Sequence, residues 1–255
     1  STKIHMIDKL FHEVARQIDW DELAYRFLVS LLSENRIQLP EERKDITLRH
    51  IALLNERNEK LLRNDIQKWL EKEIFENYQM SYEFRIAMIY LCMAQLEPEQ
   101  DSSFLSVAIK EWLRGELRLI STLKKALIFQ KIVRHNARHM LFSLAHWLKM
   151  VGMNGLVLSL DIYRYTMIPP RPRYADDGLY YSAAATLDMY EVLRQFIDGT
   201  DELEHCLIIV FATQKFLTDE QRSYTKSPAL KMRICDEVRD KHRQNPFAPL
   251  LRISA

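Results

Sequence analysis

Residues 155–162, Gly-Leu-Val-Leu-Ser-Leu-Asp-Ile, form a short apolar run that ends on the carboxylate of Asp161. A second run, residues 206–213, reads Cys-Leu-Ile-Ile-Val-Phe-Ala-Thr and ends on the hydroxyl of Thr213. Short apolar runs without alternation are typical of strands buried on both faces, as in parallel sheets. We therefore predict strands at about 156–160 and 206–212 in one small parallel sheet, with Asp161 and Thr213 side by side at the edge where the strands end.

The order of elements in the second half of the chain indicates an α/β fold. A helix is expected at about 182–197, where Asp198-Gly199 supplies a C-terminal signal, and another at 229–242. A third strand could begin at residues 250–253. Strands that alternate with helices predict a partial α/β core over residues 131–255, built on the small parallel sheet.

The first part of the chain, residues 1–130, is expected to be all helical. The sequence has five glycines in 255 residues and 47% hydrophobic residues, a composition that favours helices around a proper core. Residues 81–96 are apolar almost all round, which predicts a central, buried helix. Periodicity and capping residues predict further helices at 4–14, from Asp19 or Asp21 to residue 32, at 46–77 as one or two helices, from Ser102 or Ser103 to Gly115, and at 117–150 as one or two helices. The chain as a whole is expected to be a mostly helical α/β protein.

Bulk properties exclude several classes of protein. The formal net charge of +1 gives no electrostatic signature of nucleic-acid binding, so nucleic acid stays a possible partner that the charge does not indicate. The three cysteines are widely spaced and form no CxxC pair, which indicates neither a zinc ribbon nor a disulfide framework and fits a reducing cytoplasm. No apolar run approaches the roughly 20 residues that cross a bilayer, and the first residues have no signal-peptide pattern, so no membrane partner is expected.

Asp161 and Thr213 are the candidate functional residues of the predicted sheet. A carboxylate at the end of a strand can hold Mg²⁺, which prefers one or two carboxylates together with nucleotide phosphates. Thr213 could then sense the terminal phosphate from the neighbouring strand. The alternative is that Asp161 begins an ordinary surface turn and that Thr213 simply ends a strand.

Four arginines are candidates for binding phosphate or a neighbouring subunit, because a guanidinium group matches phosphate oxygens with two hydrogen bonds. They are Arg171, Arg173, Arg222 and Arg233. The alternative for each is a solvated surface side chain. The sequence contains no G-x-x-x-x-G-K-[ST] string, so these 255 residues lack the standard loop that surrounds the β- and γ-phosphates of a nucleotide.

Three histidines, His135, His139 and His146, are spaced four and seven residues apart and are expected on one helix face. Such a pattern can bind zinc, which leaves a metal-dependent hydrolase as a third hypothesis. Basic residues flank the same face, so the polar side of an amphipathic helix is the ordinary interpretation.

Several segments, in this order and spacing, resemble the ATP-binding proteins of bacteriophage-exclusion (BREX) systems. The similar segments are residues 134–145, 152–162, 190–198, 210–217, 222–224, 228–230 and 245–253. The resemblance implies a P-loop ATPase of the AAA+ type in a phage-defence system, with ATP and Mg²⁺ as ligands. By position it makes Asp161 the Walker B acid and Thr213 the first sensor.

Two departures from the family pattern bear on activity. Ile162 stands where such ATPases usually have a glutamate that polarises the attacking water, so hydrolysis by the usual route is not expected. The Walker A segment is missing, so the chain is either a fragment that begins after it or a degenerate relative. The resemblance then implies a helical insertion followed by a partial ATPase core.

The leading hypothesis is a protein that binds ATP–Mg²⁺ and uses it to switch assembly or contacts with partner proteins. The competing hypothesis is a non-enzymatic helical module for protein–protein interaction. A fragment would leave a sheet edge near residues 206–212 without its neighbour, and exposed edges predict self-association.

Overall fold

The computed structural model describes residues 3–97, 101–167 and 180–238. The chain divides into two compact units. We call Asp8–Leu156 with Glu204–Cys206 the helical unit, and Ser1–Ile7, Val157–Leu203 and Leu207–Ala255 the sheet unit.

The helical unit is built from helices in chain order. Their bounds are α1 Ile7–Arg16, α2 Trp20–Glu34, the 3₁₀ turn η1 Arg43–Asp45, α3 Leu48–Leu54, α4 Glu59–Leu70, the π-helical turn η2 Glu71–Phe75, α5 Tyr82–Leu96, α6 Asp101–Arg114, the 3₁₀ segment η3 Ile120–Ala126 and α7 Ala137–Met150. The region predicted as one or two helices at 46–77 forms two, α3 and α4, and η2 extends α4. In η2 the N–H of Glu76 donates to the carbonyl of Glu71 over 3.1 Å, the i→i+5 bond of a π-helix.

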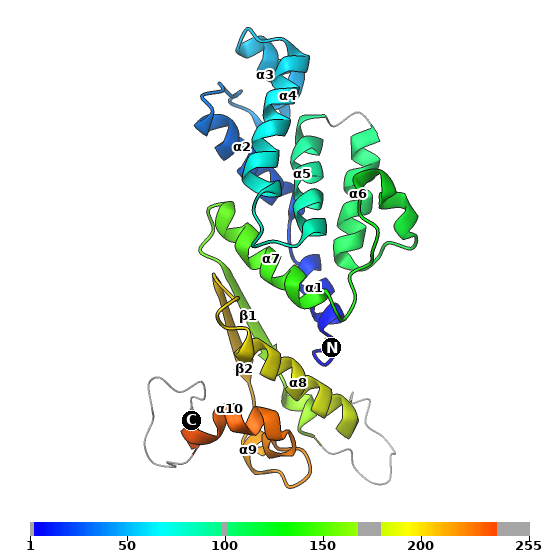
Figure 1. Cartoon of the computed structure of the whole chain (residues 1–255), viewed down its shortest axis with the longest axis vertical. Coiled ribbons are helices and arrows are strands. Elements are labelled where there is room, and N and C mark those ends of the chain that lie inside the picture. The colour runs from blue at the N-terminus through cyan, green and yellow to red at the C-terminus, as the bar shows by residue number, and fades with distance from the viewer. Residues whose placement is uncertain (1–2, 98–100, 168–179, 239–255) are drawn as a thin grey trace. The chain divides into compact units, whose positions relative to one another are not determined.

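Helix α5 lies at the centre of this unit, as its apolar sequence predicts. It packs against α2 on one side and α6 on another, and Figure 1 shows α5 and α6 side by side. Ser81 caps it, because its Oγ accepts the N–H of Phe84 over 3.3 Å. Phe84, Met88 and Leu91 are fully buried. Burial of these side chains is the main contribution to the stability of this helix.

Local signals explain where most of these helices begin. Asp19 caps α2, since its carboxylate accepts the N–H of Glu22 over 3.0 Å. The expected cap at Ser102 or Ser103 is wrong: α6 already begins at Asp101, so both serines lie within the helix.

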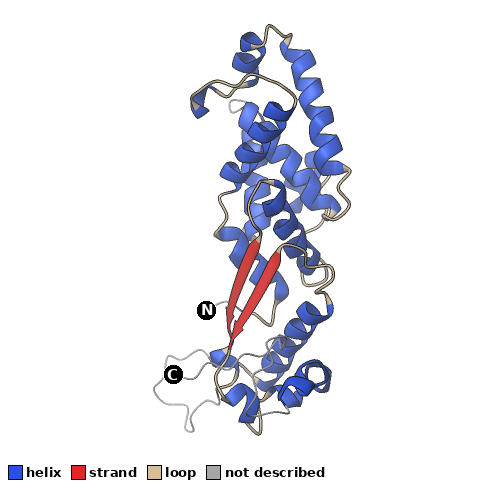
Figure 2. Cartoon of the chain, turned by 90° about the vertical axis from the view of Figure 1, so that its left-hand side faces the viewer, coloured by secondary structure: helices blue, strands red, loops and turns tan. Residues whose placement is uncertain are grey.

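The sheet unit contains the two predicted strands. They are β1 (Leu156–Asp161) and β2 (Cys206–Phe211), which form a two-stranded sheet among the described residues. The N–H of Leu156 donates to the carbonyl of His205 over 2.8 Å, and the N–H of Ile162 donates to that of Phe211 over 3.0 Å. Both strands therefore run in the same direction, and Figure 2 shows them side by side. The predicted mostly helical α/β fold with a small parallel sheet is confirmed.

Helices and short turns follow each strand. Their bounds are the 3₁₀ turn η4 Tyr163–Tyr165, α8 Ala183–Asp198, α9 Lys215–Thr218, the 3₁₀ turn η5 Tyr224–Lys226 and α10 Pro228–Val238. The Oγ of Ser182 caps α8 by accepting the N–H of Ala185, and Gly199 is its C-terminal cap. The third strand suggested for residues 250–253 lies outside the described residues.

The expectation that both strands are buried on both faces is wrong. On β1, Leu158 and Leu160 are buried, whereas Val157 is 62% exposed. On β2, Leu207 is 57% exposed and Phe211 is 51% exposed. In the part of the chain that the structure describes, each strand has one strand neighbour and only one face of β1 is covered, so apolar side chains remain in contact with solvent.

Candidate functional site

The candidate site lies where β1 and β2 end. The pairing of Ile162 with Phe211 brings the carboxyl ends of both strands to the same edge of the sheet. Asp161 is the last residue of β1, and Thr213 follows β2 by two residues. The structure therefore places the acid and the hydroxyl at one edge, which is the arrangement expected for a ligand site in a parallel sheet.

Asp161 faces solvent because of its phase in the strand. Side chains alternate between the two faces of a strand, so Leu158, Leu160 and Ile162 point to the core while Asp161 points away from it. One carboxylate oxygen, Oδ1, accepts the N–H of Tyr163 over 2.9 Å and begins the turn η4. The side chain is thus oriented by a local turn and remains accessible to a ligand.

Ile162 is fully buried. The residue after the acid therefore belongs to the core face, and its side chain cannot reach a nucleotide at the solvent side of the strand. The absence of a glutamate at this position follows from the packing, since an ionised carboxylate there would be buried without a partner.

Thr213 supplies an unusual polar atom. Its Oγ1 is buried and has no hydrogen-bond partner among the residues that the structure describes. A buried hydroxyl without a partner costs free energy, and such atoms in native proteins call for an explanation. A ligand or a rearranged loop that pairs with this oxygen would recover that free energy.

The four candidate arginines have different surroundings. Arg222 is buried: its Nη1 lies 2.7 Å from the carbonyl of Tyr181 and 3.2 Å from both the carbonyl of Tyr165 and Oγ1 of Thr186. The hydroxyl of Tyr190 donates to the backbone carbonyl of Arg222, and burial raises the pKa of Tyr190 well above its usual value, so this donor keeps its proton. Arg222 thus connects η4, α8 and Tyr181, which lies just before α8.

Arg233 is held differently, on α10. Its Nη2 lies 2.7 Å from Oδ2 of Asp198, and its Nη1 donates to the carbonyl of Ala229 over 2.8 Å. The guanidinium group of Arg233 is also the main cause of the lowered pKa of Asp198. Arg171 and Arg173 lie outside the described residues. The structure does not gather Arg222 and Arg233 with Asp161, and a phosphate-binding or subunit-binding role for any of the four stays a prediction.

The histidines do not form the predicted group on one helix. Helix α7 begins at Ala137, so His135 lies in the turn before it, and His139 is exposed on the first turns of the helix. His146 instead lies near Glu204 and His205, just before β2. The sequence analysis missed this cluster, because His146 lies far in the chain from Glu204 and His205. The one local signal was the Glu204-His205 pair directly before a predicted strand.

No helix in residues 3–97, 101–167 and 180–238 has both the length and the apolar character needed to cross a membrane.

Residues 44–255 match the family described as BREX system ATP-binding protein BrxC/D. The match covers most of the chain, including α3 to α10 and both strands. No curated protein and no solved structure matches the chain.

Proposed function

The chain belongs to the family of BREX system ATP-binding proteins, and from this membership we propose that the edge formed by the ends of β1 and β2 binds ATP–Mg²⁺. Asp161 holds the magnesium ion, directly or through a water molecule, and Thr213 contacts the terminal phosphate. The observation that supports this most is the parallel pairing of the strands, which brings the acid and the hydroxyl to one edge.

The residues present fit such a ligand. Mg²⁺ prefers oxygen ligands and usually has only one or two carboxylates from the protein. Asp161 is exposed, and its Oδ2 makes no hydrogen bond to any of the residues described. The unpartnered Oγ1 of Thr213 is a second oxygen that would be paired in a nucleotide-bound state. When bound, the ion would neutralise phosphate charge, while the chain's own residues orient the nucleotide.

Nucleotide binding, rather than hydrolysis, is the role proposed for this edge. The buried Ile162 cannot orient an attacking water molecule. The glycine-rich loop that surrounds the phosphates is not among these 255 residues. Binding and release of ATP would then change the packing of η4 and α9 at the strand ends, and so switch assembly or contacts with partner proteins. We place this role in the cytoplasm, where free thiols such as those of Cys92 and Cys206 stay reduced.

The test is calorimetry of MgATP binding by the natural polypeptide and its Asp161→Asn variant. Loss of one charged oxygen ligand should weaken MgATP binding roughly tenfold, with little effect on ATP in EDTA. Asp201→Asn is the matched control, because Asp201 is exposed on the turn before β2. Equal MgATP affinity of the wild type and Asp161→Asn would refute the magnesium role.

A second candidate function, protein–protein interaction, is favoured by a groove in the helical unit. The groove has a volume of about 1030 Å³ and is lined by apolar side chains of η2, α5 and α6, together with polar side chains of α4 and η3. Phe104 on its wall is 69% exposed, and Tyr82 is 41% exposed. Exposed aromatic side chains around a groove are typical of surfaces that bind a partner.

Sedimentation velocity of the wild type and two variants, over a range of concentrations, tests whether the chain self-associates through the groove or through β2. Phe104→Ser should weaken association if the groove is the interface, and Leu207→Lys should weaken it if the exposed strand is. Leu53→Ser is the control, since Leu53 is 70% exposed and does not line the groove. A wild-type chain that stays monomeric at all concentrations would contradict both interfaces.

A further inference from the structure

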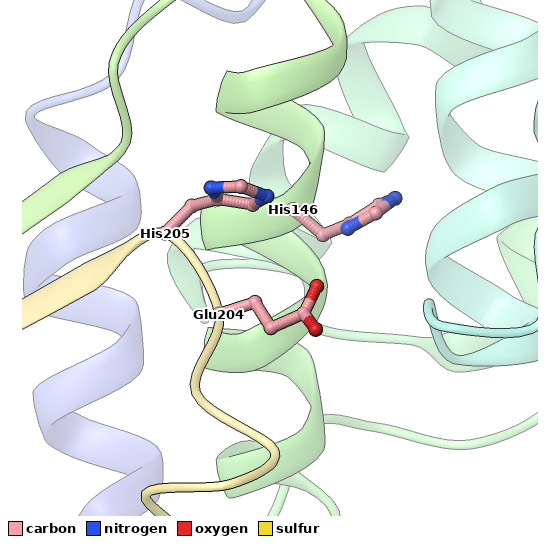
Figure 3. Close-up of side chains that lie close together, drawn as sticks. All are labelled: His146, Glu204 and His205. Atoms are coloured by element: carbon pink, nitrogen blue, oxygen red, sulfur yellow. The ribbon is translucent and has the colours of Figure 1, made fainter.

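The helical unit contains a cluster of three potential metal ligands that the proposed nucleotide site does not use. They are His146 on α7 and the consecutive residues Glu204 and His205, which precede β2. One ligand atom from each side chain lies within 4.8 Å of the other two. Figure 3 shows the three side chains extending from α7 and from the chain before β2 toward a common region.

We propose that His146, Glu204 and His205 bind a divalent transition-metal ion, with zinc as the best match. Two imidazoles and one carboxylate suit zinc, and nickel, copper and cobalt to a similar degree. The fourth position of a tetrahedral zinc ion would be occupied by water, since two of the three residues are exposed. Around one zinc ion the ligand atoms lie about 3.3 Å apart, so the side chains need only a small rotation to close on the ion.

The ligand atoms are available. The side chains of Glu204 and His205 make no hydrogen bond or ion pair with any of the described residues. His146 uses only Nε2, which lies 3.0 Å from Nδ2 of Asn77, and this leaves Nδ1 for the ion. A ligand histidine normally has its other ring nitrogen held by a neighbouring polar group, and Asn77 stands in that position. Its amide would present oxygen instead of nitrogen when Nε2 carries the proton.

The protonation state of His146 also suits a metal ligand. Burial, and then the nearby His205, lower the pKa of His146 below its usual value, so the ring is neutral near pH 7. Only a neutral imidazole can coordinate a metal ion. The carboxylate of Glu204 beside the two imidazoles is a group that attracts a cation.

The backbone holds Glu204 and His205 in an unusual conformation. His205 has φ +57°, in the left-handed region that residues other than glycine adopt rarely. The carbonyl of His205 accepts the N–H of Leu156, and Gly155 has φ +131° beside it. A Cβ at Gly155 would lie 2.2 Å from the oxygen of His205, so only glycine allows this approach. Strained residues held by their surroundings are concentrated at ligand sites.

The experiment is a titration of the metal-free protein with ZnCl₂ by calorimetry, with CoCl₂ absorption as a second measurement. The wild type should bind one Zn²⁺ per chain, and Co²⁺ should give the intense visible bands of four-coordinate geometry. Glu204→Gln and His205→Asn should each weaken Zn²⁺ binding by at least roughly tenfold. Asparagine also tolerates the left-handed conformation, and Glu204 is exposed, so both variants should fold, which circular dichroism checks.

His139→Asn is the matched control, since His139 is an exposed histidine of the same helix outside the cluster. It should bind Zn²⁺ as the wild type does. The proposal is overturned if the wild type binds no Zn²⁺ at a one-to-one ratio, or if folded Glu204→Gln and His205→Asn bind it as tightly as the wild type. Either result leaves the nucleotide proposal unaffected, because Asp161 and Thr213 are not part of the cluster.

Discussion

The two units are stabilised in different ways. The helical unit surrounds large apolar side chains completely: Phe84 and Trp147 are fully buried. The sheet unit also buries Met189 and Tyr190 completely, but apolar residues on both of its strands are exposed. The segments around η4 and α8 are in addition connected by the buried guanidinium group of Arg222. The difference teaches that apolar burial supports the helical unit, whereas the packing of η4 and α8 combines apolar burial with a buried polar network around Arg222.

A pair of phenylalanine substitutions gives the largest test of this comparison. Phe84→Ala should lower the free energy of unfolding by about 3–5 kcal/mol, because it leaves a cavity at the centre of the helical unit. Phe211→Ala removes the same ring from a site that is 51% exposed and should cost about 1 kcal/mol or less. Urea unfolding measures both. Similar losses for the two variants would break the comparison.

Arg222 tests the polar half of the comparison. Arg222→Met should lower the free energy of unfolding by about 2–4 kcal/mol, because three oxygen acceptors would lose their donor. Arg233→Met is the control and should cost much less, since its pair with Asp198 is exposed to solvent. If the Arg222 variant unfolds at the same urea concentration as the Arg233 variant, the buried guanidinium group is not important for stability.

Gly155 tests how the helical unit holds the segment Glu204–Cys206. Gly155→Ala should cost about 1–3 kcal/mol, because φ +131° is unfavourable for alanine and the new Cβ would overlap the His205 carbonyl. Gly152→Ala is the control for backbone strain alone, because Gly152 also has positive φ but nothing lies within 4 Å of an added Cβ. Thermal unfolding of the two variants separates backbone strain from the steric overlap, and a larger loss at Gly152 would argue against the overlap.

A histidine buried in the helical unit gives the smallest expected effect. Burial lowers the pKa of His12 below 6.5, and its Nδ1 donates to the carbonyl of Leu113 over 2.9 Å. The unfolded chain therefore binds this proton more readily than the folded one, so stability is retained above pH 6.5 and declines as the pH falls below it. His12→Gln should reduce that decline, measured by urea unfolding at pH 7.5 and 5.5. An unchanged pH dependence would show that His12 does not contribute to it.

Sequence patterns were sufficient for elements with strong local signals. The apolar α5 and the two short strands follow from periodicity and composition alone. The exposure of β2 could not be predicted from the sequence, because an apolar strand at the edge of a sheet has the same residue composition as one in its middle. The same holds for the phase of β1, which places Ile162 in the core.

Contacts between distant segments were not predictable. Arginine is mostly a surface residue, so nothing in the sequence marks Arg222 as buried. The proximity of His146 to Glu204 and His205 depends on how the chain before β2 returns to α7. The local spacing of His135, His139 and His146 pointed to a different group, since α7 begins only at Ala137.

The π-helical turn η2 has a consequence for the register of α4. Leu62, Ile66, Leu70 and Ile74 are all fully buried, although they are four residues apart. In a regular α-helix each such step rotates a side chain by roughly 40° around the axis, so the last of them would move away from the buried face. The wider turn at Glu71–Phe75 compensates for this rotation. A regular α-helix over the same residues would place Ile74 about 120° around the axis from Leu62, and would so turn this isoleucine outward and expose it to water.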